Sequence, residues 1–484
     1  MMSLMQDLVP PAAQDSRPRA ESHLGRWIGP GAYLVLGLTL LLWVANAAKP
    51  LTMPDAYFNL RFGEEFLSGH WSLTNPGSPT PFATAHWAPT QWSSEIVMAY
   101  VDRHFGLAGV CWLMGTLGLL LILAVYRLAR REGGPLAAAF ATFAMVVIAS
   151  ASLSPRAQMV SYLFTAVFVA GVLRMRTDGR VRWWLVPLMW VWVTAHGMWP
   201  VGLSIVGAGA LGIVLETRSR ETVRRMALLV GLLLIAAATT PVGLRAYEAV
   251  LAVSSRRSYI PEWAPTNFMS GTNVVLAACI VGVLVAGLRR RSAMPWTDVL
   301  LLVVGLGWAL YGARGVPVAA TILAPYVART LQQGLTAPRA PVREGWVIGS
   351  MFVAATAALA LTVTNQPGAP FQACSWETKA LSALPAGTVV LNEGSLGGYL
   401  VWRYPALEIT SYGYFDTYTD PEFQRLFRLI RVQPGWVEDV QATGAKVALL
   451  KADSPLAYGL IQALHWNVVE SDATYQLLRA PGSR

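Results

Sequence analysis

Long apolar runs recur along this sequence, and they constrain its fold more than any other feature. A helix needs about 20 apolar residues to cross a bilayer, and runs near this length fill most of the chain up to residue 365. The chain is 54% hydrophobic and only 13% charged, which is outside the usual range of soluble domains. We therefore expect an α-helical multispanning membrane protein with about eleven transmembrane helices. The expected spans lie near residues 30–48, 106–126, 135–153, 159–175, 183–198, 200–215, 226–241, 272–288, 296–312, 315–331 and 345–364.

Two parts of this pattern allow alternatives. The first run ends in Ala45-Asn46-Ala47, which resembles a signal-peptidase site. The run is about 18 residues long, however, which is longer than a usual secretory signal, and we expect an uncleaved helix. The region 183–215 fits either two short helices or one broken helix.

Basic residues predict the orientation. With a cytoplasmic N-terminus, the short inside segments contain most of the Lys and Arg residues before residue 365, as the positive-inside rule requires. The polar residues 1–26 then form a disordered cytoplasmic tail, and the C-terminal segment is extracytoplasmic. The net charge of +10 does not indicate nucleic-acid binding, because the basic residues form no patch with interleaved aromatic residues.

The segment 366–484 differs in kind from the membrane domain, 27–365. Its charges are spread evenly and its apolar runs have the length of strands, so we expect a small extracytoplasmic α/β domain with a largely parallel sheet. The glycine-rich stretch 394–398 matches no full phosphate-binding fingerprint, and a structural turn is the expected alternative. Strands are expected near 388–391, 407–411, 447–450, 467–470 and 475–478, and helices near 420–432, 435–443 and 455–464.

The first external loop, 49–105, is the other large segment outside the expected spans. Aromatic residues recur at helical spacing behind Asp55, which predicts a short amphipathic helix over 55–68 on the membrane surface. The Pro- and Trp-rich stretch that follows suits the headgroup level. Trp87 in this stretch either packs within the protein or stacks on a sugar ring.

Ionisable residues gather on one expected side of the membrane. They lie at the external ends of successive helices, where the positive-inside rule disfavours arginine and where burial of a charge is costly. Arginines bind phosphate through paired hydrogen bonds, and a carboxylate can deprotonate a hydroxyl nucleophile. The pattern therefore predicts a site for a lipid-linked phosphate at the external surface. These residues are Asp55, Glu95, Arg156, His196, Arg245, Glu262 and Arg314.

Several motifs resemble a group of bacterial multispanning proteins of the GT-C glycosyltransferase superfamily. The motifs are DAYFNLRFGEEFLSGHW from residue 55, SPRAQMVSYLF at 154–164, WVTAHGMWPVGL at 192–203, PEWAPTNF at 261–268 and WALYGARGVPVAA at 308–320. The resemblance continues into the C-terminal segment through GGYLVWRYPALEI at 397–409. It implies a bacterial plasma (inner) membrane protein with an extracytoplasmic active site, a polyprenyl-phosphate sugar donor and inversion at the anomeric carbon.

The resemblance also implies roles for individual residues. It makes Asp55 the catalytic base, because the family carries an aspartate in the first external loop. Many members have a second acid beside it, whereas Pro54 and Ala56 flank Asp55 here, so we expect no metal and no soluble cofactor. Donor phosphate is then expected to bind Arg61, Arg156 and Arg314, and further substrate contacts are expected from Glu95, His196, Arg245, Glu262 and Trp87.

The same residues have structural interpretations as well. Asp55 precedes a periodic run and fits a helix N-cap. Arg61 fits a side chain that extends to the lipid headgroups, His196 fits a hydrogen-bonded core histidine, and Glu262 fits a surface cap. The sequence contains no His or Cys cluster that would support metal binding.

The sequence therefore predicts a membrane glycosyltransferase that moves a sugar from polyprenyl phosphate to an extracytoplasmic hydroxyl on a glycan, lipid or protein. Two other functions stay open. A lipid or solute transporter or flippase also needs charges near the membrane, but it predicts internal repeats and polar groups at the midplane. A non-catalytic scaffold with an external binding domain predicts that Asp55→Asn leaves the function intact.

Overall fold

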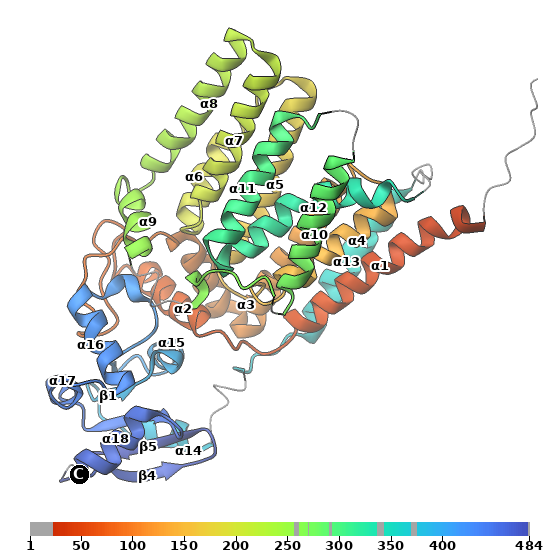
Figure 1. The fold of residues 1–484 in the computed structure, drawn as a ribbon. Coiled ribbons are helices and arrows are strands. Elements are labelled where there is room, and N and C mark those ends of the chain that lie inside the picture. Colours follow the sequence, from red (N-terminus) through yellow and green to blue (C-terminus); the bar gives the residue numbers. More distant parts are fainter. Residues whose placement is uncertain are drawn as a thin grey trace, which may run out of the picture.

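Each apolar run expected to span the membrane folds as a helix (Figure 1). The computed structural model describes residues 23–255, 261–269, 271–289, 293–335, 343–368 and 375–482. The expected tail lies outside these ranges up to residue 22, and residues 23–26 belong to the first helix. The helices of this part are α1 (His23–Ala47), α3 (Trp92–Ala129), α4 (Pro135–Ala149), α5 (Gln158–Asp178), α6 (Leu185–Ala195), α7 (Pro200–Thr217), α8 (Arg220–Ala238), α10 (Asn273–Leu288), α11 (Trp296–Tyr311), α12 (Val316–Gln332) and α13 (Glu344–Thr362).

The region 183–215 forms two helices, α6 and α7, and a short junction that contains His196 separates them. The second expected span starts earlier than its apolar run, because α3 begins at Trp92 and continues through a kink at Gly106. Gly106 has a φ of 65°, a left-handed conformation that glycine adopts without the steric cost of a Cβ.

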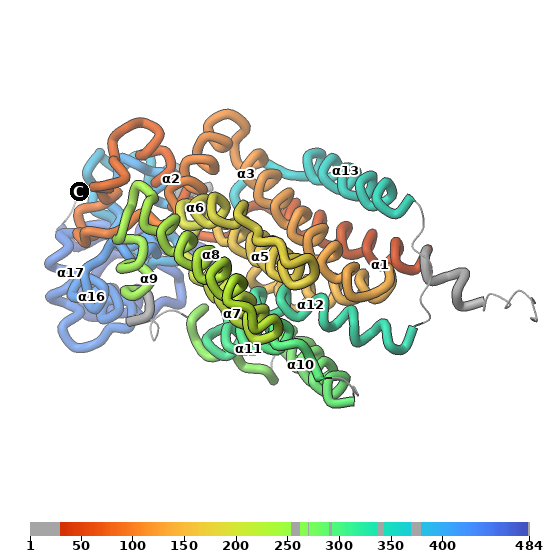
Figure 2. Tube along the Cα trace, turned by 90° about the horizontal axis from the view of Figure 1, so that it is seen from above, coloured from red at the N-terminus to blue at the C-terminus, as the bar shows by residue number. Residues whose placement is uncertain are grey.

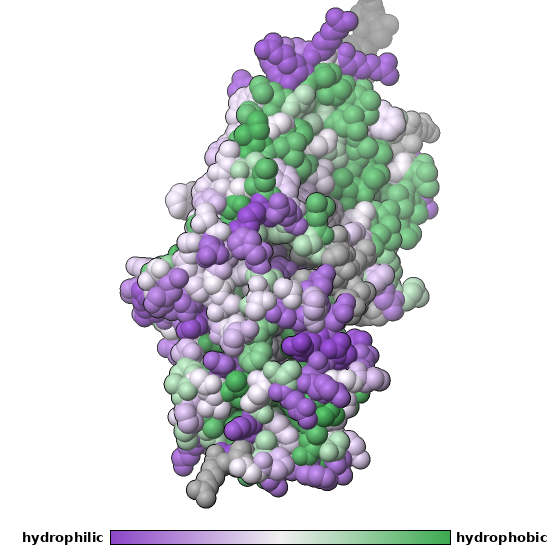
Figure 3. Space-filling view, turned by 90° about the vertical axis from the view of Figure 1, so that its left-hand side faces the viewer, coloured by the Kyte–Doolittle hydropathy of each residue, from purple (hydrophilic) through white to green (hydrophobic). Residues whose placement is uncertain are grey.

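Five helices of the described part are long and apolar enough by themselves to cross a membrane. They lie in α1, α3, α5, α7 and α13, and the count of about eleven crossings stays a prediction. In Figure 3, apolar side chains gather over the upper, helical half of the molecule below a polar tip, whereas polar and apolar side chains are mixed over the lower half. In Figure 2, α1 and α13 run side by side at one edge of the bundle.

The first external loop begins with α2 (Pro54–Leu67), which is the helix expected over 55–68. Its residues Tyr57 and Phe62 are fully buried, so it packs within the protein rather than lying freely on the membrane surface. A Cβ added to Gly63 would lie 2.0 Å from the carbonyl oxygen of Glu95. The glycine therefore lets α2 approach the backbone of α3.

The C-terminal strands appear where the sequence predicts them, but the sheet is mixed rather than largely parallel. Its order is β2-β1-β3-β5-β4. β1 is parallel to β2 and β3, whereas β5 is antiparallel to both β3 and β4. The connection between β4 and β5 is a short turn, which can join only antiparallel neighbours. The strands are β1 (Val389–Asn392), β2 (Glu408–Ile409), β3 (Val447–Lys451), β4 (Asn467–Ser471) and β5 (Tyr475–Arg479).

The C-terminal domain packs directly on α2 through α15 (Gly394–Arg403). The glycine-rich stretch at the start of α15 is thus part of a packed helix. A Cβ on Gly398 would lie 2.2 Å from the carbonyl oxygen of Pro54, and Tyr57 packs edge-on against Tyr399 with ring centroids 5.3 Å apart. The other helices of this domain are α14 (Ser375–Ser382), α16 (Asp420–Arg431), α17 (Trp436–Thr443) and α18 (Pro455–Leu464).

Gly398→Ala tests this docking. The new methyl group would meet backbone atoms, which cannot move aside without shifting α15, so we expect a loss of about 1–3 kcal/mol in stability. The measurement is the melting temperature in detergent. Gly231→Ala on α8 is the matched control, because no atom lies within 4 Å of its added Cβ and alanine favours a helix. Equal melting temperatures for the two variants would contradict the docking.

Candidate active site

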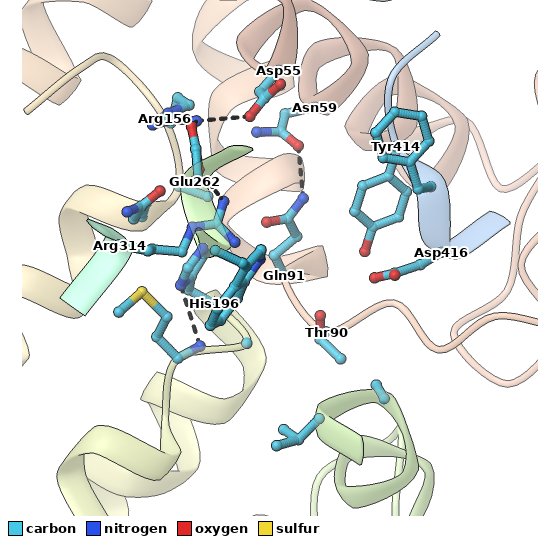
Figure 4. A pocket seen from close by; sticks show the side chains of 18 of the residues that line it. Asp55, Asn59, Thr90, Gln91, Arg156, His196, Glu262, Arg314, Tyr414 and Asp416 are labelled. Atoms are coloured by element: carbon cyan, nitrogen blue, oxygen red, sulfur yellow. Dashed lines mark hydrogen bonds and ion pairs between the residues drawn. The ribbon is translucent and has the colours of Figure 1, made fainter. Parts of the chain in front are cut away.

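A cavity of about 490 Å³ lies where α2, the helix junctions and the C-terminal domain meet. Its volume is in the range of sites for small ligands. Figure 4 shows the polar side chains that converge on it. The residues of its lining discussed below are Asp55, Asn59, Thr90, Gln91, Arg156, His196, Glu262, Trp263, Arg314, Tyr414 and Asp416.

Asp55 lies in the first turn of α2 and faces this cavity. The N-cap of the helix is Met53, which makes no side-chain capping bond, so the interpretation of Asp55 as the N-cap is wrong. A carboxylate in the first turn is still favoured by the helix dipole. Its Oδ2 accepts a hydrogen bond from Arg156 Nη1 at 2.9 Å, and its side chain is 36% exposed.

Arg156 lies in the junction between α4 and α5, and its side chain is only 9% exposed. Nε donates to Ser154 Oγ at 2.8 Å, while Nη1 donates to both Asp55 and Glu262. Burial lowers the pKa of the Arg156 guanidinium, but the two carboxylates raise it by more. The group is therefore a fixed positive charge, held at the centre of the cavity wall.

Arg314 supplies the second positive charge from the short helix η3 (Ala313–Gly315). Its Nη2 pairs with Glu262 Oε2 at 2.9 Å, and its guanidinium lies over the ring of Trp263 at 5.2 Å. Its buried Nε has no hydrogen-bond partner among the described residues. A Cβ on Gly315 would lie 1.9 Å from the carbonyl oxygen of Trp308, so the turn that presents Arg314 depends on glycine at this position.

Glu262 bridges the two arginines from the short helix η2 (Pro261–Trp263). Its Oε1 accepts from Arg156 Nη1 at 2.8 Å, and its Oε2 pairs with Arg314. Burial raises the pKa of Glu262, but the positive charges of Arg314 and Arg156 lower it by more. The carboxylate is therefore charged at neutral pH. Glu262 thus connects the two arginines in the wall of the cavity and is not a surface cap.

His196 lies outside the helices, in the junction between α6 and α7, and a chain of hydrogen bonds orients it. The backbone N–H of Met198 donates to its Nδ1 at 3.3 Å. Because an N–H can only donate, Nδ1 is the acceptor and the ring proton is assigned to Nε2. Trp192 Nε1 donates to Ser161 Oγ at 2.8 Å, and this hydroxyl donates to the same Nδ1 at 2.9 Å.

The His196 ring is uncharged at neutral pH. Burial lowers its pKa well below the ordinary value, and the charges of Arg314 and Arg156 lower it further. A neutral ring with its proton on Nε2 is a hydrogen-bond donor and is not a base at this nitrogen.

Polar amides extend the floor of the cavity from Asp55. Gln91 Nε2 donates to Asn59 Oδ1 at 2.8 Å and to Glu95 Oε1 at 3.1 Å. Glu95 is fully buried and does not belong to the lining. Glu95 orients Gln91, which does line the cavity. Glu95 therefore lies behind Gln91 and not at the surface of the cavity, where a substrate contact was expected.

The C-terminal domain provides the opposite wall of the cavity. Tyr414 and Asp416 lie across from Arg314 and His196 in Figure 4. The Tyr414 hydroxyl points toward Asp416 in Figure 4. Burial raises the pKa of this hydroxyl, and the charge of Asp416 adds to the effect, so the group keeps its proton. The cavity therefore belongs to both parts of the chain.

Three expected site residues lie elsewhere. Arg61 pairs with Glu65 at 2.5 Å and does not line the cavity. Trp87 is buried among aromatic rings, with its centroid 5.4 Å from that of Tyr414. Arg245 donates to the backbone carbonyl oxygens of Thr74 and Trp87. Arg245 and Trp87 thus stabilise the first external loop.

Asn59, Gln91 and Tyr414 are lining residues that the sequence did not single out as site residues. Asn59 could have been predicted as a lining residue, because it lies four residues after Asp55 and therefore on the same face of α2. Tyr414 could not have been predicted in this way, since only docking of the C-terminal domain brings it to the cavity. The described residues contain no group of three or more His, Cys, Asp or Glu side chains that could hold a metal ion.

Comparison with known proteins identifies solved structures with a similar fold. No family model matches the sequence, and neither does any curated protein. The chain superposes on ArnT from Cupriavidus metallidurans in the apo state with a TM-score of 0.55 and 17% identity, covering 92% of this chain and 97% of that chain. This chain has the GT-C fold.

Two further solved structures with this fold are similar. ArnT from C. metallidurans bound to undecaprenyl phosphate gives a TM-score of 0.53 and 17% identity, covering 96% of this chain and 99% of that one. The apo oligosaccharyltransferase from Archaeoglobus fulgidus gives a TM-score of 0.55 and 11% identity. The superposition covers 90% of this chain and 70% of that one.

His196→Asn tests the uncharged histidine. Because its pKa is lowered in the folded protein, the unfolded chain takes up the proton first as the pH falls below about 6.5. Stability linked to His196 is thus present above that pH and is lost below it, by at most about 1.4 kcal/mol per pH unit. Asparagine keeps an acceptor for the Met198 N–H but does not titrate. We expect the melting temperature of the variant to fall less steeply than that of the wild type between about pH 7 and pH 5.

The exposed His104→Asn is the control for this measurement, and it should keep the wild-type slope. A His196→Asn variant with the wild-type slope would show that the histidine titrates normally in the folded protein.

Proposed function

We propose that this protein is a membrane glycosyltransferase that transfers a sugar from a polyprenyl-phosphate donor to a hydroxyl acceptor. The observation that carries the proposal is the meeting of one carboxylate, Asp55, with two guanidinium groups, Arg156 and Arg314, in one cavity. The cavity lies at the end of the helical bundle that the C-terminal domain covers. This is where a lipid-linked phosphate, with its chain in the bilayer, would present its headgroup.

Such a transfer requires removal of a proton from the acceptor and binding of the donor phosphate, and different residues perform these two tasks. Asp55 is the general base that takes the proton of the acceptor hydroxyl. Arg156 and Arg314 bind the phosphate and stabilise the charge that develops on it as the bond to the anomeric carbon breaks. Attack on the face opposite the phosphate inverts the anomeric carbon. Two of these groups are held in place before substrate binds, Asp55 by its helix and Arg156 by its hydrogen bond to Ser154.

The similar structures support the choice of donor. One of the ArnT structures contains undecaprenyl phosphate, and the chain aligns with almost all of that protein. The wall formed by Tyr414 and Asp416 lies opposite the arginines and is the proposed place of the acceptor. The proposed location is a bacterial inner membrane, with the N-terminus cytoplasmic and the C-terminal domain outside. The proposed phosphate site is built from arginines and requires no metal.

Asp55→Asn removes the proposed base but keeps the size of the side chain. In proteoliposomes with radiolabelled polyprenyl-phosphate sugars and envelope extract as acceptor, we expect a loss of transfer of about 10²-fold to 10⁴-fold. Binding of undecaprenyl phosphate should persist. Glu64→Gln is the control on the same helix, because Glu64 pairs with Arg103 at the surface. Wild-type transfer by Asp55→Asn would favour a transporter or a scaffold instead.

Arg314→Gln removes one of the two proposed phosphate ligands. Because a hydrogen bond between charged groups contributes about 1.5–3 kcal/mol, binding of undecaprenyl phosphate should weaken about 10-fold to 100-fold. Titration of the purified protein with this lipid measures the change. Arg103→Ala, an exposed arginine outside the cavity, should bind as the wild type does. Unchanged binding by Arg314→Gln would mean that the phosphate binds elsewhere.

A further inference from the structure

The proposed phosphate site already holds an anion that belongs to the protein. Glu262 places one carboxylate oxygen 2.8 Å from Arg156 Nη1 and the other 2.9 Å from Arg314 Nη2. These are the two guanidinium groups that the proposed function assigns to the donor. A carboxylate and a phosphate use the same N–H donors of arginine. A phosphate that binds Arg156 Nη1 and Arg314 Nη2 would therefore displace the Glu262 carboxylate from these atoms.

The ion-pair cluster of Asp55, Arg156, Glu262 and Arg314 has no net charge without a ligand, and Asp416 on the opposite wall of the cavity adds a negative charge. Arg156 and Arg314 contribute two positive charges, and Asp55 and Glu262 contribute two negative charges. His196 adds none, because burial and both arginines keep its pKa low. A phosphate that enters this site adds negative charge to a neutral group. The repulsion it meets from Glu262 grows with the charge that it carries.

The position of Glu262 allows its carboxylate to move. The residue lies on η2, a single turn outside the helical bundle, and its side chain is 41% exposed. The neighbouring Trp263 anchors this turn, since it packs edge-on against Tyr311 with centroids 5.7 Å apart. The backbone N–H of Ala313 also donates to the carbonyl oxygen of Ala264 at 3.1 Å. The carboxylate can thus leave the arginines by a change of rotamer while the turn stays docked.

We propose that Glu262 is an internal competitor for the phosphate site, and that it selects the singly charged donor over the doubly charged lipid product. The proposal rests on the proposed function. Without lipid, Glu262 occupies Arg156 and Arg314. The phosphate of the donor displaces it, and after transfer the carboxylate regains the arginines and promotes release of the product.

The change of charge follows from the reaction itself. The donor phosphate is a diester with one negative charge. When the bond between the anomeric carbon and the phosphate oxygen breaks, its electron pair stays on that oxygen, and the proton of the acceptor hydroxyl is on Asp55. The lipid product is then a monoester, whose second ionisation has a pKa of about 6. Near neutral pH it carries close to two negative charges, which a neighbouring carboxylate repels more strongly than one.

Glu262→Gln removes the charge of the side chain and keeps its size. The probes are undecaprenyl phosphate, which is the monoester, and its methyl ester, a singly charged diester. Their dissociation constants are measured by titration at about pH 8, where the monoester is a dianion. We expect Glu262→Gln to bind the monoester at least about tenfold more tightly than the wild type, and to gain clearly less affinity for the diester.

Two outcomes would overturn the proposal. Unchanged or weaker binding of the monoester by Glu262→Gln would show that Glu262 does not compete with phosphate. An equal gain for both probes would show competition without selection by charge. Glu262→Asp keeps the charge and should keep the preference for the diester. The melting temperature of each variant establishes that it is folded.

Arg314→Gln distinguishes this proposal from the proposed function. If Arg314→Gln binds undecaprenyl phosphate as the wild type does, the phosphate site itself is wrong. If Arg314→Gln weakens binding while Glu262→Gln does not strengthen it, only the competition by Glu262 fails. Glu64→Gln, which removes a carboxylate at the surface of α2, should change neither dissociation constant.

Discussion

The rest of the site depends on the ion pairs of the buried Arg156 guanidinium with Asp55 and Glu262. A charge that is only 9% exposed is stable only with partners, because loss of solvation is costly. Asp55 and Glu262 provide these partners from distant parts of the chain. The first external loop, the junction between α4 and α5, and η2 must therefore converge on one point. The cavity is the space that this convergence leaves open.

Docking of the C-terminal domain closes the other side of that cavity. Gly398 lets α15 approach the carbonyl oxygen of Pro54, the residue before Asp55. The same docking brings Tyr414 and Asp416 opposite the arginines. The mixed sheet takes no part in the lining and acts as a support for these loops. The contact between α15 and α2 thus couples the position of Asp55 to the shape of the proposed acceptor wall.

Part of the site could be predicted because of the alternation of the helices. Asp55, Arg156, His196, Glu262 and Arg314 all fall at junctions on the same expected side, and all five line one cavity. Arg61 lies away from this cavity because of helical periodicity. At about 100° per residue, Asn59 lies about 40° from Asp55 around α2, whereas Arg61 lies about 120° away and pairs with Glu65 instead.

Most of the helices and strands lie where the sequence predicts them, because hydrophobic periodicity and turn residues are local properties. Only the tertiary structure shows which of the predicted site residues share the cavity. It placed Glu262 between Arg156 and Arg314, buried Trp87 in an aromatic cluster, and made half of the sheet antiparallel. These outcomes depend on distances between segments far apart in the chain, which a local pattern does not encode.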